Sequence, residues 1–309
     1  MDFRQSVIKA FGEFPQKPEL RYNEISSTVM DGYTLQSVEY YVEDNEKVNA
    51  YLMLPETLKE KNPAILAAHQ HAMNFHIGKS EVVGLAGDPM FAYGLELCKR
   101  GYVVIAPDHL CFEERIKPHF RSRPENDRQY ELYEFVTRMQ NGSSLKVKYL
   151  HDMIIAVDVL ENLPFVDKNK IGVIGHSLGG QEATWLTWYD KRIAAGVSSC
   201  GFSQMGVLFD KNIILALSMY IPGFTKIGDM CDIVHGIAPR PFFMTSGAID
   251  WTFPIEGVEY IIENAVSRYE QLGSPDNFRS IIFDGGHRFE SDVRQEVYDW
   301  LDRVLAKKA

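Results

Sequence analysis

The sequence predicts an α/β fold: a mostly parallel central sheet, helices on both of its faces and a small cap insertion. Short runs rich in apolar and β-branched residues alternate with longer segments of helical spacing, which is the order that βα units produce. The run YVVIA at 102–106 is continuously apolar and bounded by Gly101 and Pro107, as expected of a strand buried on both faces. Two earlier strand-like segments flank a polar turn at 44–45, which indicates an antiparallel pair at the start of the sheet.

The individual elements follow in the order that this alternation sets. Residues 1–12 have the amphipathic spacing of a short helix, and Gly101 stands where the helical pattern of 89–100 should end. Residues 107–128 are polar and aromatic without a period, so we expect a long loop there. Strands are expected at 35–42, 48–54, 64–68, 102–106, 170–174, 193–198, 241–246 and 278–283. Further helices are expected at 129–140, 145–163, 178–189, 255–272 and 290–307.

Length and composition indicate one large domain. The chain has 309 residues, of which 45% are hydrophobic and 24% are charged, and these values are typical of a globular protein. We expect a single domain over 1–309, with 1–33 as an N-terminal helical extension. Residues 201–238 are irregular apart from one apolar helix expected near 207–220, and they are too long for a simple connection. We therefore interpret 201–238 as a cap or lid insertion.

Charge and cysteine content restrict the partners and the location. A net charge of −10 disfavours binding to a polyanion such as nucleic acid. The four cysteines form no C-x-x-C pair and do not suggest a disulfide framework. The N-terminus lacks the apolar core of a signal peptide, and the longest apolar stretch, 213–221, is too short to cross a bilayer. We expect a cytoplasmic protein that binds a small molecule and neither nucleic acid nor membrane, and homo-oligomer formation stays open.

The strongest chemical signal is GHSLGG at 175–180, between an expected strand and an expected helix. Small residues two positions before and after Ser177 permit the sharp turn of a nucleophile elbow. Such a turn exposes the serine hydroxyl at the positive end of the following helix. The alternative is a glycine-rich turn without chemistry, but the strand–turn–helix context favours Ser177 as a catalytic nucleophile.

A serine nucleophile needs a base and an acid that orients the base. His287 follows the last expected strand in the string DGGH, and it is the only histidine in the sequence beyond residue 235, so we predict it as the base. Asp250 lies just beyond the strand expected at 241–246, where ligand-side residues of a parallel sheet gather, and we predict it as the acid. Asp284 is the weaker candidate, because it is close enough in sequence to hydrogen-bond His287 locally instead.

Two backbone N–H groups should form an oxyanion hole beside the nucleophile. One belongs to Leu178, directly after the serine, and the other to the loop that follows the strand at 64–68. We place this second donor at His71, with Ala72 as the alternative. The expected walls of the substrate pocket are Tyr220, Phe224 and Trp251.

The same loop also raises the question of a metal site. His69 and His71 match the beginning of the H-x-H-x-D-H pattern of dinuclear metal hydrolases. Met73 and Asn74 then replace the required Asp and His, so the pattern fails. We expect no metal and no organic cofactor.

With these residues in place, the chain resembles the α/β-hydrolase superfamily. More narrowly, it is similar to dienelactone-hydrolase-like and acetyl-xylan-esterase-like bacterial serine hydrolases. The resemblance rests on GHSLGG at Ser177, SGAIDWTFP at Asp250 and FDGGHRF at His287, and it covers roughly residues 35–305. It implies an α/β-hydrolase fold. Two departures stand out: dienelactone hydrolases proper use a cysteine nucleophile, and the oxyanion loop, commonly HGxG in relatives, reads HQHA here.

The expected function is that of a serine hydrolase. It would cleave a carboxylic ester of a small soluble substrate through an acyl-enzyme intermediate, with Ser177 as nucleophile, His287 as base and Asp250 as the orienting acid. One alternative is a peptidase or amidase of the prolyl-oligopeptidase type, whose triad has the same order. A second alternative is a non-catalytic binding module on a hydrolase fold, since fold does not fix function.

Overall fold

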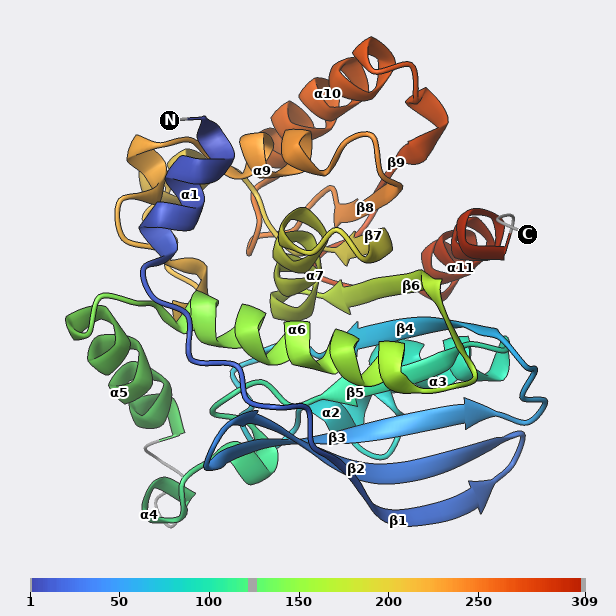
Figure 1. The fold of residues 1–309 in the computed structure, drawn as a ribbon. Helices are drawn as coiled ribbons and strands as arrows, with labels where there is room; N and C mark the ends of the chain where they lie inside the picture. Colours follow the sequence, from blue (N-terminus) through green and yellow to red (C-terminus); the bar gives the residue numbers. More distant parts are fainter. Residues whose placement is uncertain (1, 122–126, 307–309) are drawn as a thin grey trace.

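The computed structural model describes residues 2–121 and 127–306, and one sheet forms the centre of this part of the chain (Figure 1). Its strands are β1 (Tyr22–Met30), β2 (Tyr33–Glu43), β3 (Glu46–Pro55), β4 (Asn62–Ala68), β5 (Val103–Pro107), β6 (Val166–His176), β7 (Ile193–Ser199), β8 (Phe242–Gly247) and β9 (Phe278–Phe283). They lie in the order β1-β2-β3-β5-β4-β6-β7-β8-β9. The pairs from β1 to β5 in this order are antiparallel, and every later pair is parallel.

Helices cover both faces of the sheet (Figure 1). They are α1 (Phe3–Phe11), α2 (Lys79–Val82), α3 (Tyr93–Lys99), α4 (Pro118–Arg121), α5 (Asp127–Gln140), α6 (Leu145–Asn162), α7 (Leu178–Tyr189), α8 (Met205–Asp210), α9 (Met230–Ile237), α10 (Ile255–Gln271) and α11 (Ser291–Ala306). One core lies between the sheet and α6, α7, α9 and α10, and a second lies between the sheet and α2, α3 and α11. Successive residues of β4 serve both cores, since Leu66 packs in the first and Ile65 in the second. This architecture confirms the predicted fold class.

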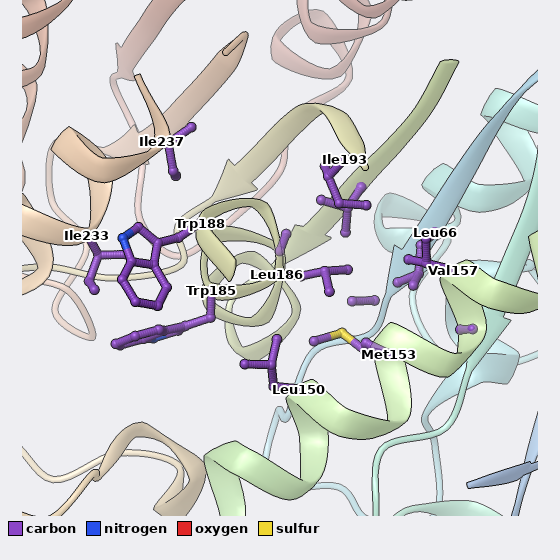
Figure 2. Close-up of a cluster of buried hydrophobic side chains, with 14 of the residues drawn as sticks. Leu66, Leu150, Met153, Val157, Trp185, Leu186, Trp188, Ile193, Ile233 and Ile237 are labelled. Carbon is purple, nitrogen blue, oxygen red and sulfur yellow. The ribbon is translucent and has the colours of Figure 1, made fainter. Parts of the chain in front are cut away.

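The first core anchors α7, the helix that begins directly after Ser177. Trp185 and Trp188 of α7 are each only 1% exposed, and the centroids of their rings lie 5.8 Å apart. Figure 2 shows these tryptophans beside Ile233 of α9, with Leu150 of α6 on the neighbouring side. Large aromatic side chains buried in this way contribute strongly to core packing, so the position of α7 is well determined.

The N-terminal segment 1–33 is only partly the helical extension that the sequence predicts. α1 is helical as expected, but β1 extends the sheet by pairing with β2. Seven of the nine residues in β1 are exposed, so the strand carries no buried apolar alternation that a sequence pattern could reveal. Backbone hydrogen bonding to a neighbouring strand, rather than side-chain burial, therefore defines this element.

The helix expected near 207–220 is wrong, because α8 ends at Asp210. Asn212 adopts a left-handed backbone with a φ of 57°, and its N–H donates to the carbonyl of Phe209. The N–H of Ile213 donates to the carbonyl of Leu208, which completes a Schellman motif and stops the helix. The chain continues with two short 3₁₀ turns, η4 (Leu217–Met219) and η5 (Phe224–Lys226), before α9.

The long loop expected at 107–128 contains two short helical turns. These are η2 (Glu113–Arg115) and α4, and residues 122–126 lie outside the described residues. None of the helices in the described part of the chain combines the length and the apolar character needed to cross a membrane.

Candidate active site

Ser177 lies in the turn between β6 and α7 and has unusual backbone geometry. Its φ of 55° and ψ of −120° are rare for a residue other than glycine, and such strain is typical of a nucleophile elbow. Two glycines permit the turn. A Cβ on Gly175 would lie 2.2 Å from the backbone carbon of Gly179, and one on Gly179 would lie 2.0 Å from the carbonyl oxygen of Ala68. These close approaches bring the N-terminus of α7 against the end of β4.

Asp250 and His287 come from the loops that follow β8 and β9, and the backbone ties these loops together. The N–H of Ala248 donates to the carbonyl of Phe283 at 2.9 Å, and the N–H of Ile249 donates to that of Gly285 at 3.0 Å. As a result His287 Nδ1 lies 2.8 Å from Asp250 Oδ2. Because a carboxylate only accepts, Nδ1 carries the proton, and Nε2 is left as the basic nitrogen.

Further hydrogen bonds hold the Asp250 carboxylate in place. Its Oδ1 accepts from the backbone N–H of Thr252 at 2.8 Å and from that of Phe253 at 3.3 Å. The side chain of Asp250 is 1% exposed, whereas Asp284 is an exposed residue. The structure therefore brings Asp250, not Asp284, together with His287.

Ser177 and His287 both line one pocket of about 390 Å³ at the carboxyl edge of the parallel strands. No hydrogen bond joins the two side chains among the described residues, and catalytic contacts of this kind often tighten only when substrate binds. The segment 201–238 contributes an apolar wall to this pocket. The side chains that form this wall belong to Ile214, Leu215, Ala216 and Met219, and Gly201 of the same segment also lines the pocket.

The predicted oxyanion residues also line this pocket. Leu178 is the first residue of α7, so its N–H has no partner within the helix. His71 and Ala72 line the wall contributed by the loop after β4, and Ala72 has a left-handed φ of 46°. The His71 ring is fixed, since its Nδ1 accepts from the Met73 N–H at 3.1 Å and its Nε2 donates to Glu131 Oε1 at 3.2 Å.

Two of the three expected pocket walls are wrong. Phe224 is 3% exposed and packs on Trp185, with ring centroids 5.4 Å apart, so it belongs to the core. Tyr220 lies behind the wall, where its hydroxyl accepts a hydrogen bond from the Leu215 N–H at 3.0 Å. Trp251 does line the pocket, at its rim, where it is 78% exposed. Apolar composition identified the segment but not which side chains face inward.

His69, the first histidine of the incomplete metal-binding pattern, is fully buried, and its hydrogen-bond partners differ from those of His71. Its Nδ1 donates to the carbonyl of Gln70 at 2.8 Å, and its Nε2 accepts from the N–H of His109 at 3.1 Å. Burial lowers the pKa of His69 to about 4. Both ring nitrogens are thus engaged by the backbone, and the ring acts as a neutral link between two loops.

Cys200, Asp250 and His287 offer ligand atoms within 4.8 Å of one another, so distance alone allows a metal there. Cys200 is fully buried, and burial raises the pKa of its thiol to about 12. A neutral thiol is a poor nucleophile, because attack requires the thiolate. Its Sγ instead donates to the carbonyl of Arg288 at 3.4 Å.

The second cluster of possible metal ligands consists of Asp108, Glu113 and Glu114, whose carboxylates surround the ammonium of Lys79. Lys79 Nζ lies 2.6 Å from Asp108 Oδ2 and 2.5 Å from Glu113 Oε2, and it also contacts Glu114. The lysine thus supplies the positive charge that a cation would bring. We interpret the cluster as a structural clamp between α2 and the loop after β5.

Sequence reasoning missed three polar residues of the pocket, Thr252 next to the predicted Trp251, Arg128 on α5 and Gln181 on α7. Gln181 lies four residues after Ser177, and its N–H donates to the Ser177 carbonyl at 3.0 Å. Helical periodicity places such a residue on the same face as the nucleophile, so its position could have been derived from the sequence. Arg128 had no comparable signal, because α5 reaches the pocket only through the tertiary fold.

Comparisons with known proteins agree with this architecture. A model of the Abhydrolase family matches residues 1–284. YtaP of Bacillus subtilis (strain 168), provisionally named a hydrolase, is 26% identical over 307 residues, which cover 98% of both chains. A provisionally named acetyl xylan esterase from Bacteroides fragilis NCTC 9343 superposes with a TM-score of 0.76 at 22% identity, over 91% of this chain and 73% of that one. A glucuronoyl esterase from Solibacter usitatus superposes with a TM-score of 0.70 at 18% sequence identity, over 97% of this chain and 91% of that one.

Proposed function

This chain belongs to the Abhydrolase family, and we propose that it is a serine hydrolase that cleaves a carboxylic ester of a small soluble substrate. The observation that carries this proposal is the strained Ser177 on the wall of a pocket that also contains His287, whose Nδ1 is bonded to the buried Asp250. The names of the two structural neighbours, an acetyl xylan esterase and a glucuronoyl esterase, support an ester as the bond that is cleaved.

In the proposed mechanism Ser177 Oγ attacks the ester carbonyl while His287 Nε2 takes the hydroxyl proton. The N–H groups of Leu178 and of His71 or Ala72 then hold the negative oxygen of the tetrahedral intermediate. His287 returns its proton to the departing alcohol, and the acyl group stays on Ser177. Water next attacks this acyl-enzyme with His287 again as base, which releases the acid and restores Ser177. Asp250 holds the imidazole in the required tautomer and stabilises its charged form.

The size of the pocket supports a small substrate. A volume of about 390 Å³ is at the lower end of the range of ligand sites, and the wall from 201–238 covers one side of it. We propose that this segment acts as a fixed cover and disfavours polymers and long-chain lipids. A cytoplasmic location, and the lack of nucleic-acid or membrane partners, belong to the same proposal.

The test combines a chemical label with a substrate panel. A fluorophosphonate probe should label the wild-type protein at Ser177, and Ser177→Ala should abolish the labelling. The wild-type protein should hydrolyse short p-nitrophenyl esters faster than the matching p-nitroanilides, and Ser177→Ala should lower kcat by roughly 10⁴–10⁶. Preferred cleavage of the anilides would favour the peptidase alternative. Ester hydrolysis that persists in Ser177→Ala would exclude Ser177 as the nucleophile.

A further inference from the structure

Gln181 lines the pocket one helical turn after Ser177, yet it is only 1% exposed. Its amide orientation is determined by a buried lysine. Lys146 Nζ lies 3.2 Å from the Gln181 side chain, and a lysine ammonium can donate hydrogen bonds but cannot accept them. The atom that faces Lys146 must therefore be the amide oxygen Oε1. The two N–H bonds of Nε2 are left over, and no described residue accepts a hydrogen bond from them.

Lys146 is in turn held by groups in the core. Its Nζ lies 2.5 Å from Glu182 Oε1, and the same oxygen accepts from Ser218 Oγ of η4 at 3.3 Å. Lys146, Glu182 and Ser218 are all fully buried. Burial lowers the pKa of Lys146 and raises that of Glu182, and their mutual contact opposes both shifts. The array therefore joins α6, α7 and the cover segment and holds the Gln181 amide in one orientation.

A buried ion pair of this kind is weak evidence for stability, because replacing it by apolar residues of similar volume is often neutral or stabilising. The lysine of this pair also contacts Gln181 of the pocket wall, and we interpret the pair as holding that side chain in place. The remaining walls agree with this interpretation. None of the described lining residues is acidic, and Arg128 adds a guanidinium group. The pocket thus offers hydrogen-bond donors beside apolar surface, in a protein whose net charge is −10.

We propose that Gln181 is a specificity-determining residue that donates a hydrogen bond from Nε2 to an oxygen atom of the substrate, and that Lys146 is the residue that positions it. The substrate class is an ester whose acyl or alcohol part carries an ether, hydroxyl or carboxyl oxygen near the scissile bond. The inference rests on the proposed ester hydrolysis and names the substrate class of that same pocket.

Two pairs of esters that differ by one CH₂-to-oxygen exchange test the inference. p-Nitrophenyl methoxyacetate and butyrate probe the acyl side, and 2-methoxyethyl and n-butyl acetate probe the alcohol side. Each kcat/KM is divided by the hydroxide rate of the same ester to remove intrinsic reactivity. The wild-type protein should prefer the oxygen-bearing member of at least one pair. Gln181→Leu should reduce that preference by about 2- to 12-fold, the range that one net hydrogen bond confers.

Two further variants separate recognition from folding. Lys146→Met should reduce the same preference although Gln181 is still present, and Lys146→Met combined with Glu182→Gln repeats this test without an unpaired buried carboxylate. Gln271→Leu is the control: it makes the same Gln-to-Leu substitution at an exposed residue of α10 and should leave the substrate preference unchanged. Melting temperatures are measured for every variant, since a purely structural role would lower Tm without changing the selectivity.

The outcomes distinguish this inference from the proposed function. If the wild-type protein hydrolyses these esters but shows no preference in either pair, or if Gln181→Leu keeps the preference, the role of Gln181 is refuted. If Gln181→Leu loses the preference and both Lys146 variants retain it, Lys146 does not position the amide. If the wild-type protein hydrolyses none of the esters, the proposed function fails and this inference fails with it.

Discussion

Replacing Asp250 by asparagine should stop catalysis by changing which nitrogen of His287 carries the proton. Asp250 Oδ1 accepts from two backbone N–H groups, those of Thr252 and Phe253, so the amide oxygen of the asparagine must occupy that position. The amide NH₂ then takes the place of Oδ2, which lies 2.8 Å from His287 Nδ1. Two facing donors repel, so the imidazole proton moves to Nε2. The nitrogen that should accept the Ser177 proton is thereby blocked.

The expected loss in kcat is about 10⁴, the size found when a triad aspartate becomes asparagine, and it corresponds to about 5 kcal/mol of activation free energy. The assay is p-nitrophenyl acetate hydrolysis, with thermal denaturation to verify that the isosteric exchange preserves the fold. Asp284→Asn is the matched control, because Asp284 is exposed and should affect the rate by less than about twofold.

The losses of activity caused by Asp250→Asn and by Ser177→Ala are also expected to be non-additive. Groups that act as one unit lose activity together, so Asp250→Asn should add little to the loss already caused by Ser177→Ala. The reasoning is refuted if Asp250→Asn keeps more than about a tenth of the wild-type rate, or if Asp284→Asn is the variant that loses activity.

Three further predictions concern stability. Gly179→Ala should cost at least the roughly 1–3 kcal/mol of an overpacked core and impair activity, because its Cβ would lie 2.0 Å from the Ala68 carbonyl oxygen. Gly206→Ala is the control, because its Cβ would make only an ordinary contact, 3.8 Å from Asp229 Oδ2, and equal melting temperatures for the two variants would contradict this prediction. The pKa of His69 is lowered to about 4 in the folded protein, against about 6.5 in the unfolded chain, so its contribution to stability is present above pH 6.5 and is lost as the pH falls toward 4. The free energy of unfolding should therefore fall by about 2 kcal/mol by pH 5 because of this group. Urea unfolding of His69→Gln should show a correspondingly smaller fall in stability between pH 7 and pH 5, and an unchanged fall would disprove the assignment. Phe224→Ala should lower the free energy of unfolding by about 3–5 kcal/mol, whereas Phe209→Ala, at a side chain that is 45% exposed, should cost far less; similar values for both would return Phe224 to the pocket wall.

Much of the fold could be predicted because its signals are local. The β6–Ser177–α7 unit combines a buried apolar strand, small residues at the turn and a helix, and the expected helix 178–189 agrees with α7. The strand β9 likewise agrees with the expected 278–283. β1 was not predicted because its side chains are mostly exposed. The prediction of a helix near 207–220 was wrong because a single left-handed residue, Asn212, ends α8. A pattern of apolar residues cannot reveal either feature.

The candidate site divides in the same way. Ser177, Asp250 and His287 could be chosen from the sequence because each follows an apolar run that becomes a parallel strand, and the carboxyl ends of such strands meet at one edge. The 2.8 Å contact between His287 and Asp250 depends on two loops joined by backbone hydrogen bonds, which no single segment encodes.

By itself, therefore, the sequence determined the order of the βα units, the elbow at Ser177 and which side chains could carry the chemistry, since these depend on residues close together in the chain. Only the tertiary structure decided that Phe224 is buried against Trp185, and that Lys146, 35 residues before Gln181, controls its amide. The reason is physical, because burial and hydrogen-bond geometry depend on which surfaces meet after the sheet and helices have packed. Segments that are distant in the sequence share no local pattern from which such a contact could be predicted.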